Sequence, residues 1–571
     1  MIAVAGISGP INIPGHGPDF WRLTRGMAEM TGGEALAGQL VRERVSMLFG
    51  VPGVQLDWAF DGLYKEREHI KFVGPRHEQA TTYMADGYAR TRGEVGVAMV
   101  VPGPGILNAA AGLATAYSVS SPVLLIAGQI DSRHIGEGLG HLHEIPDQTS
   151  ILRSLTKWTA RAEGPADIPR LVQEAFRQLR SGRPRPVALE VPPDILAARA
   201  DIALLDPVPV EGFRTRPDAA RIREAAALLR RAQRPVILAG GGIEASGAAP
   251  ELARLAEALQ APVVMSNSGR GAISDRHSLA LPSIAGGKIL PEADLVLAVG
   301  TRFTGSSAQA LAEGTPLILM NVDERDLYRH SRAQVAILSD AREGLEALSD
   351  ELDDLSRRPG PWLNLETVRD ACAADVESVQ PQAQYVRALR SAIPDDGILV
   401  SELTQVGYLS RIAYPVYVPR TFIHPGYQGT LGYGFPTALG IKMGLPDRAV
   451  VSITGDGGFG WGNSELATMR KYNIGLVTVI FNDKAFGNVK RTQKYDFEGR
   501  MMGTDLVNPD YVKLADAYGI RGMQVDGPEA LEGALKEAIA ANEPCLIEVP
   551  VGEMDSPWGL VMGRPAIPAR P

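Results

Sequence analysis

The sequence of 571 residues has few cysteines, no excess of basic residues and no apolar run behind a basic stretch at its start. Two cysteines, Cys372 and Cys545, are too few for a disulfide framework or a zinc cage, and they favour a cytoplasmic protein. With 57 Lys and Arg against 66 Asp and Glu, the net charge of −9 argues against a nucleic-acid partner. The first residues do not resemble a signal peptide, and we expect residues 1–30 to form a loose arm.

One stretch, residues 95–130, contains no charged residue and imitates a membrane span. It includes Pro-Gly-Pro-Gly at 102–105, Asn108 and a Ser-rich segment at 118–121, which would leave backbone polar groups unsatisfied in lipid. Parallel strands that are buried on both faces also produce unbroken apolar runs. We therefore predict a strand, a glycine loop, a helix and a second strand here, and no membrane partner.

Short apolar runs alternate with longer segments of helical period along the chain, which is typical of βαβ units and parallel sheets. We therefore predict an α/β fold of three domains, each with a parallel sheet flanked by helices. Linkers rich in Pro and Gly suggest that the domains span residues 31–201, 215–356 and 364–555. The predicted strands are 96–101, 123–127, 187–191, 235–239, 262–265, 295–299, 317–321, 397–400, 449–454, 476–482 and 545–549.

The sharpest motif is a glycine loop, Gly-Asp-Gly-Gly-Phe-Gly at 455–460, between a predicted strand and a helix predicted from about 464 to 471. Its backbone amides can form an anion site. The same six residues also match Gly-x-Gly-x-x-Gly, the dinucleotide-binding motif of nicotinamide dehydrogenases. However, Asp456 would repel a phosphate unless a cation stood between them, and Asp483 follows the next strand. We therefore favour Mg²⁺. The remaining alternative is that Asp456 caps the helix and Asp483 lies in a turn.

These residues resemble the thiamine diphosphate motif, in which Gly-Asp-Gly is followed by an Asn pair. The resemblance implies that Asp456, Asp483 and the backbone carbonyl of Ala485 hold Mg²⁺. Asp replaces the usual Asn at 483, and the extra charge should tighten cation binding. The resemblance also implies that Leu431 is an apolar wedge between the cofactor rings and that the Gly429 carbonyl and the Leu431 amide bind the pyrimidine. The cofactor-binding residues implied for the third domain are Gly429, Leu431, Gly455, Asp456, Gly457, Gly458, Asp483 and Asn488.

Residues 76–80, Arg-His-Glu-Gln-Ala, resemble the segment that carries the catalytic glutamate of this family. Glu78 is therefore predicted to relay protons at the pyrimidine ring, and burial in an apolar cleft would raise its pKa and suit that task. The alternative is a solvated glutamate at the start of a helix.

The resemblance to the acetolactate synthase branch of this family covers about residues 31–551, including Val-Pro-Gly-Pro-Gly at 101–105 and Gly-Thr-Leu-Gly-Tyr-Gly-Phe-Pro at 429–436. Such proteins build each site from the pyrimidine-binding first domain of one chain and the diphosphate-binding third domain of another. The resemblance thus implies a homodimer or homotetramer with shared active sites.

The substrate pocket departs from that branch. Gly-Asn-Val-Lys-Arg-Thr at 487–492 places Asn488 and Thr492 where acetolactate synthases carry Met and Trp, so the pocket is more polar. Lys490 and Arg491 would suit a substrate with an extra carboxylate or hydroxyl, unless they are solvated charges on a helix face.

Three histidines are candidate proton donors. His141 and His143 lie in the part of the first domain where simple 2-oxo acid decarboxylases carry a histidine pair, and the alternative is an ordinary surface position. His424 precedes the pyrimidine motif. Many relatives bind FAD through the central domain. Gly-Thr-Arg-Phe at 300–303 fits that use, whereas 304–306 and 281–283 do not, so FAD is compatible with the sequence but not predicted.

The predicted function is that of a thiamine diphosphate- and Mg²⁺-dependent enzyme acting on a 2-oxo acid by decarboxylation, carboligation or both. Two enzyme alternatives are a lyase that cleaves a 2-hydroxy ketone (an acyloin) and a simple 2-oxo acid decarboxylase. The alternative outside enzymes is a regulator that binds thiamine diphosphate without catalysis, and an intact Glu78 argues against it.

Overall fold

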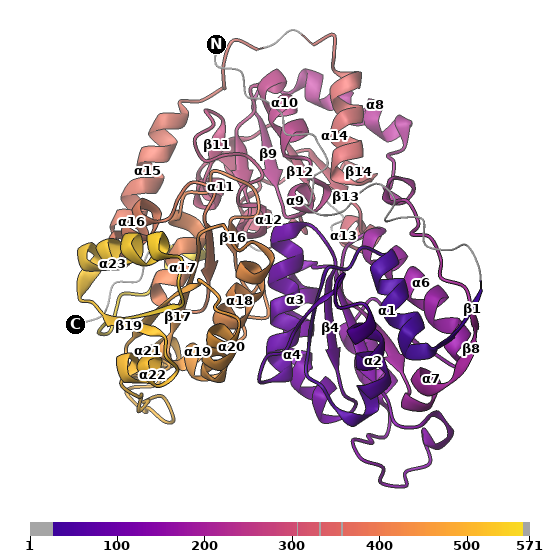
Figure 1. The fold of residues 1–571 in the computed structure, drawn as a ribbon. Helices are drawn as coiled ribbons and strands as arrows, with labels where there is room; N and C mark the ends of the chain where they lie inside the picture. Colours follow the sequence, from indigo (N-terminus) through magenta and orange to yellow (C-terminus); the bar gives the residue numbers. More distant parts are fainter. Residues whose placement is uncertain (1–26, 305, 330–332, 356–357, 563–571) are drawn as a thin grey trace.

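The computed structural model describes residues 27–304, 306–329, 333–355 and 358–562, and it contains three six-stranded parallel sheets flanked by helices (Figure 1). The predicted α/β fold is confirmed. Residues 1–26 of the predicted arm and Gly305 lie outside the described residues, whereas β1 (Ala28–Thr31) pairs with β8 (Arg199–Ile202) in an antiparallel ribbon. Within the described ranges, every helix is too short or too polar to span a lipid bilayer.

The first sheet lies in residues 47–191 and includes the charge-free stretch, which forms a strand, a helix and a strand as predicted. From edge to edge its strands are β3 (Lys71–Val73), β2 (Met47–Gly50), β4 (Gly96–Val100), β5 (Val123–Gly128), β7 (Val187–Val191) and β6 (Trp158–Arg161). Its helices are α1 (Gly32–Arg42), α2 (Asp57–Lys65), α3 (Glu78–Arg92), α4 (Pro104–Val119), α5 (Gln148–Leu155), α6 (Ile168–Arg180) and α7 (Pro193–Ala197).

The central sheet is also parallel, but its strand order differs from that of the first sheet. Its strands, in spatial order, are β11 (Ala280–Leu281), β10 (Val263–Met265), β9 (Pro235–Ala239), β12 (Leu295–Val299), β13 (Leu317–Asn321) and β14 (Val335–Leu338). Its helices are α8 (Ala219–Arg231), α9 (Gly242–Ser246), α10 (Ala249–Leu259), α11 (Gly286–Ile289), α12 (Ser306–Ala310), α13 (Glu324–Tyr328) and α14 (Ala341–Glu351).

The third sheet holds the glycine loop at the end of one of its inner strands. Its order is β16 (Phe422–Ile423), β15 (Ile398–Ser401), β17 (Val450–Gly455), β18 (Val477–Asn482), β20 (Cys545–Pro550) and β19 (Arg521–Gln524). The helices are α15 (Leu365–Glu377), α16 (Gln382–Ala392), α17 (Gln405–Ala413), α18 (Gly434–Gly444), α19 (Asp456–Gly460), α20 (Leu466–Lys471), α21 (Gly487–Asp496), α22 (Tyr511–Ala517), α23 (Gly527–Ala541) and α24 (Trp558–Val561).

The first and third domains share one hydrophobic core, because α3 packs against α18 (Figure 1). Glycines permit the close approach of the two helices: a Cβ on Gly440 would lie 2.1 Å from the Met84 carbonyl oxygen, and one on Gly87 would lie 2.4 Å from that of Thr437. Both distances are too short for any side chain. The helix that begins at Glu78 is therefore fixed against the domain that carries Asp456.

Candidate active site

The ends of β17 and β18 carry the predicted glycine loop and the second aspartate. The parallel pairing of β17 and β18 sets Gly455 opposite Phe481. Asp456 and Asp483, which follow shortly after, therefore meet at the carboxyl ends of these two strands. The short helix α19 begins at Asp456 itself, whereas the sequence predicted a helix only from about 464. Glycine is a poor helix former, which is why these residues suggested a loop.

The two carboxylates lie close enough to interact. Asp456 is buried, and burial together with the neighbouring Asp456 charge raises the pKa of Asp483 to about 7. Two like charges in such a site repel unless a proton or a cation lies between them. Asn508 donates hydrogen bonds to Asp456 Oδ2 (2.6 Å) and to Asn482 Oδ1 (2.9 Å), so it orients Asp456. Asn508 was not predicted, because it lies in a segment without a motif.

The backbone around Ala485 is fixed by the neighbouring segment. The Phe486 amide donates to the Thr504 carbonyl (2.8 Å), and the Leu506 amide donates to the Lys484 carbonyl (2.8 Å). In the described part of the chain, no three His, Cys, Asp or Glu side chains form a metal-binding group. A cation here would therefore need a backbone carbonyl and ligand oxygens beside the two carboxylates, a donor set that suits Mg²⁺ with a diphosphate.

Glu402, which was also not predicted, is buried beneath this site. Its carboxylate accepts hydrogen bonds from the amides of Gly432 (2.7 Å) and Gly434 (2.9 Å) and from Thr454 Oγ1 (2.8 Å), and burial raises its pKa. A Cβ on Gly458 would lie 2.3 Å from Glu402 Oε1. Glu402 thus ties the pyrimidine motif to the end of β17. Its position directly after β15 is the one sequence signal that could have found it.

A cavity of about 260 Å³ opens above these groups. It contains most of the residues predicted for the third-domain half of the site, together with Gln405 and Tyr408 of α17. The lining residues are Leu403, Thr404, Gln405, Val406, Tyr408, Gly429, Leu431, Gly455, Asp456, Gly457, Gly458, Phe481, Asp483, Ala485, Phe486, Gly487, Asn488, Val489, Val551, Gly552 and Met554. All of them belong to the third domain.

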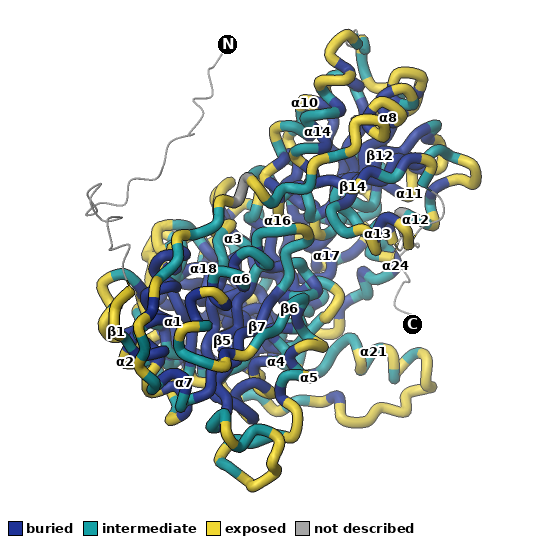
Figure 2. The backbone as a smooth tube through the Cα atoms, turned by 90° about the vertical axis from the view of Figure 1, so that its right-hand side faces the viewer, coloured by how far each residue is buried: buried dark blue, intermediate teal, exposed yellow. Residues whose placement is uncertain are grey.

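At the outer side of the cavity, α21 and α24 are in contact. Asn488 Oδ1 accepts a hydrogen bond from Trp558 Nε1 (3.0 Å), and the Trp558 ring lies 4.7 Å from that of Tyr408. Figure 2 shows α21 and the segment after it as a largely exposed projection from the body of the molecule. The predicted pocket residue Asn488 therefore both lines the cavity and holds the C-terminal helix.

The two basic residues of α21 differ in environment. Lys490 forms an ion pair with Asp505 (2.5 Å) at the surface. Arg491 is half-buried, and this burial lowers its pKa although Glu553 lies nearby. The environment of Lys490 thus agrees with a solvated charge on a helix face, and that of Arg491 agrees with it less well.

Glu78 lies in the other half of the predicted site, as the first residue of α3. Asn108 Nδ2 donates a hydrogen bond to Glu78 Oε2 (3.0 Å). The His77 side chain caps the helix by accepting from the Gln79 amide (3.2 Å). Among the residues that the structure describes, Glu78 is not part of the cavity lining. In a single chain, Glu78 and Asp456 therefore do not share one cavity.

The three predicted histidines are not brought together. His141 stacks on His134 with ring centroids 4.6 Å apart, and His143 Nδ1 lies 3.2 Å from Gln55 Oε1. His424 is buried between domains, and burial lowers its pKa well below the usual value. None of the three histidines is among the described lining residues of the cavity beside Asp456.

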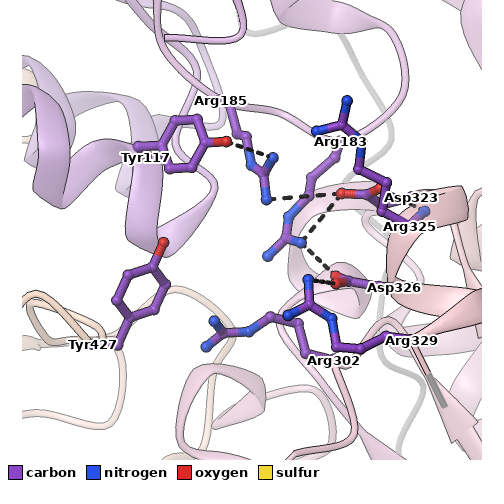
Figure 3. A pocket seen from close by; sticks show the side chains of 9 residues that line it. All are labelled: Tyr117, Arg183, Arg185, Arg302, Asp323, Arg325, Asp326, Arg329 and Tyr427. Carbon is purple, nitrogen blue, oxygen red and sulfur yellow. Dashed lines mark hydrogen bonds and ion pairs between the residues drawn. The ribbon is translucent and has the colours of Figure 1, made fainter. Parts of the chain in front are cut away.

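A second cavity, of about 350 Å³, lies where the three domains meet (Figure 3). Arg183 Nη1 contacts the carboxylates of Asp323 (3.4 Å) and Asp326 (2.5 Å), and Arg302 lies over the Tyr427 ring at 4.7 Å. The complete lining is Tyr117, Arg183, Arg185, Arg302, Asp323, Arg325, Asp326, Arg329 and Tyr427. Arg302 belongs to the Gly-Thr-Arg-Phe segment at 300–303, which is compatible with FAD binding. FAD is not part of the proposed function.

Comparisons with known proteins match all three domains. Residues 30–151 match the thiamine pyrophosphate enzyme N-terminal TPP binding domain, residues 222–348 the central domain, and residues 405–549 the C-terminal TPP binding domain of the same family.

Similar curated proteins cover nearly the whole chain. A probable acetolactate synthase large subunit of Methanocaldococcus jannaschii is 33% identical over 91% of this chain and 92% of its own length. The probable 2-ketoarginine decarboxylase AruI of Pseudomonas aeruginosa is 34% identical over 91% and 94%. The acetolactate synthase isozyme 3 large subunit of Escherichia coli is 33% identical over 90% and 93%. The chain thus belongs to the thiamine pyrophosphate enzyme family, and it is an enzyme of the acetolactate synthase-like kind.

Proposed function

We propose that this protein binds thiamine diphosphate with Mg²⁺ and decarboxylates a 2-oxo acid, after which the remaining fragment is protonated or joined to an acceptor carbonyl. The observation that carries the proposal is the cavity at the ends of β17 and β18, where two carboxylates converge beside a glycine turn. Relatives named as acetolactate synthases and as a 2-ketoarginine decarboxylase support this reaction class. Two free buried cysteines fit a reducing cytoplasm.

Mg²⁺ would be held by Asp456, Asp483 and the Ala485 carbonyl. A divalent cation held there would offset the repulsion between the two carboxylates and would allow an anionic diphosphate to bind beside them. The glycines at 455, 457 and 458 line the cavity and would lie against the diphosphate. Larger side chains have no room at two of them, because a Cβ on Gly457 would lie 2.8 Å from the Phe486 ring and one on Gly458 would lie 2.3 Å from Glu402 Oε1. Gly429 and Leu431 would bind the pyrimidine side of the cofactor.

Thiamine diphosphate, when bound, supplies a nucleophilic carbon and an electron sink for decarboxylation. Glu78 would hold a proton at its carboxyl group and would exchange it with the pyrimidine ring side of a bound cofactor. Asn108 keeps the Glu78 carboxyl in place through the 3.0 Å hydrogen bond to Oε2. Such positioned acid–base groups contribute about 10² to 10⁴-fold to rate.

The smallest active species would be a dimer, because Glu78 is not among the described residues of the Asp456 cavity. A second chain would bring its own Glu78 to that cavity. Each site would then combine Glu78 of one chain with Asp456 of the other, in a homodimer or homotetramer.

A substrate panel tests the proposal. The purified protein, supplied with thiamine diphosphate and Mg²⁺, is incubated with 2-oxo acids and with acyloins, and CO₂ and organic products are measured. We expect CO₂ from at least one 2-oxo acid, and none from the same protein carrying Asp456→Ala. An aldehyde product indicates a simple decarboxylase and an acyloin product a carboligase. Cleavage of acyloins without turnover of any 2-oxo acid would contradict the proposal and favour the lyase.

A further inference from the structure

Glu465 is a buried acid that bridges the two predicted halves of the site. It follows Asp456 by nine residues in the third domain, and it is 1% exposed. Its partners lie in the first domain, immediately before Glu78. The Arg76 amide donates to both carboxylate oxygens (3.1 and 3.0 Å), and the His77 amide donates to Oε1 (3.0 Å).

The Glu465 carboxylate is itself held by its own domain. Thr468 Oγ1 donates to Glu465 Oε2 (2.5 Å), so the carboxylate cannot rotate freely away from the amides. A further third-domain residue holds the same loop, because Tyr472 Oη accepts a hydrogen bond from the Gly74 amide (2.9 Å). The backbone that leads into α3 is thus anchored by groups outside its own domain.

We propose that Glu465 is a positioning residue for Glu78. Two amides at the N-terminal side of α3 point to one carboxylate, which fixes the direction in which the chain enters the helix and hence the location of its first residue. This inference rests on the function proposed above. Each chain would contribute Glu78 to one active site and Asp456 to the other. Glu465 is close to Asp456 in sequence, but it would act on the site that contains Glu78 of its own chain.

The variant Glu465→Gln tests the role with little change in volume. Gln keeps one acceptor oxygen, but its amide group faces backbone N–H donors and cannot satisfy them. A displacement of about 1 Å in catalytic geometry can cost about 10²-fold, so turnover should fall by about 10- to 100-fold. Thiamine diphosphate affinity should stay within a few-fold, and the deuterium exchange of the cofactor C2–H should slow with turnover.

Subunit mixing separates this role from a local one. In a dimer of Glu465→Gln and Asp456→Ala chains, one site would carry both lesions and the other neither, so activity should recover. A dimer of Glu465→Gln and Glu78→Gln chains would have a lesion in each site and should stay inactive. The matched control is Glu402→Gln, which removes another buried acceptor of backbone amides, but one whose partners lie in the third domain. It should restore activity with Glu78→Gln chains and not with Asp456→Ala chains.

The opposite pairing pattern for Glu465→Gln, or turnover equal to that of the native enzyme, would overturn the inference. Should Glu465→Gln fail to assemble, Glu465→Asp keeps the charge with a shorter reach and should give the same pairing pattern with a smaller loss. Mixing Glu78→Gln with Asp456→Ala chains tests shared sites separately. If that mixture stays inactive despite subunit exchange, the dimer proposal fails. The role of Glu465 is then tested by deuterium exchange at the cofactor C2–H alone. Normal exchange in Glu465→Gln would reject the role, and slowed exchange with native cofactor affinity would support it.

Discussion

At the scale of single residues, buried acids organise this site. Asp456, Glu402 and Glu465 are 2%, 1% and 1% exposed, and each carboxylate accepts hydrogen bonds from uncharged amide groups. Burying an acid without a cation is costly unless hydrogen bonds compensate, so each must have specific partners. Asp456 could be predicted, because a glycine motif surrounds it. Glu402 carries only the weak signal of its place directly after a predicted strand, and Glu465 carries none, because their partners include backbone amides distant in sequence, such as that of His77.

Replacing Asp456 with alanine should abolish retention of the cofactor, because the diphosphate then loses its bridging cation. Affinity for thiamine diphosphate in the presence of Mg²⁺, measured by calorimetry, should fall by more than about 100-fold. Chelation should release the cofactor from the native enzyme. The matched control is Asp505→Ala, an exposed acid near the same loop, which should bind normally. Unchanged affinity in Asp456→Ala would show that the metal assignment is wrong.

At the scale of elements, the short helix α19 shows why glycine recurs in the motif. A Cβ on Gly458 would collide with Glu402, whereas one on Gly460 would meet nothing within 4 Å among the described residues. Overpacking of this kind costs about 1–3 kcal/mol. Gly458→Ala should therefore lower the unfolding temperature at fixed protein concentration, whereas Gly460→Ala should leave it equal or slightly higher. Equal unfolding temperatures for the two variants would contradict this packing.

The strands that the sequence predicted are mainly inner strands, and this has a physical reason. In the third sheet the four predicted strands are β15, β17, β18 and β20, while the edges β16 and β19 were not predicted. The central sheet behaves likewise, with its edge strands β11 and β14 unpredicted. Inner parallel strands are buried on both faces and give apolar runs, whereas the edges here are short or mixed, as in Arg521–Gln524. Edge strands therefore leave little local signal.

At the scale of the whole molecule, the three domains meet around charged groups that no motif indicated. Glu244 in α9 of the central domain accepts a hydrogen bond from the Arg420 amide of the third domain (3.2 Å). Arg420 Nη1 in turn donates to the carbonyl of Arg90 in α3 (3.2 Å). Burial raises the pKa of Glu244 to about 7 despite these arginines. The junction is thus sensitive to protonation.

The stability of the junction should depend on pH. The pKa of Glu244 is about 7 in the folded protein, whereas the ordinary value of 4.5 applies to the unfolded chain. Between pH 4.5 and pH 7 the folded state therefore binds more protons than the unfolded state does. Stability contributed by this group should therefore be present below about pH 4.5 and should decline as pH rises to 7. Glu244→Gln removes the titration, so its unfolding temperature should rise relative to that of the native protein between pH 5 and pH 8. The exposed control Glu529→Gln should show no such trend, and a parallel pH dependence for Glu244→Gln and native protein would contradict the assignment.

The most direct test of the central claim, that this chain activates thiamine diphosphate through Glu78, is the rate of deuterium exchange at the cofactor C2–H in the assembled Glu78→Gln enzyme. Gln keeps the volume of the side chain but cannot relay a proton, so the cofactor should bind with near-native affinity. Exchange and turnover should both fall by at least about 10²-fold. Exchange at the native rate in Glu78→Gln protein with bound cofactor would contradict the account.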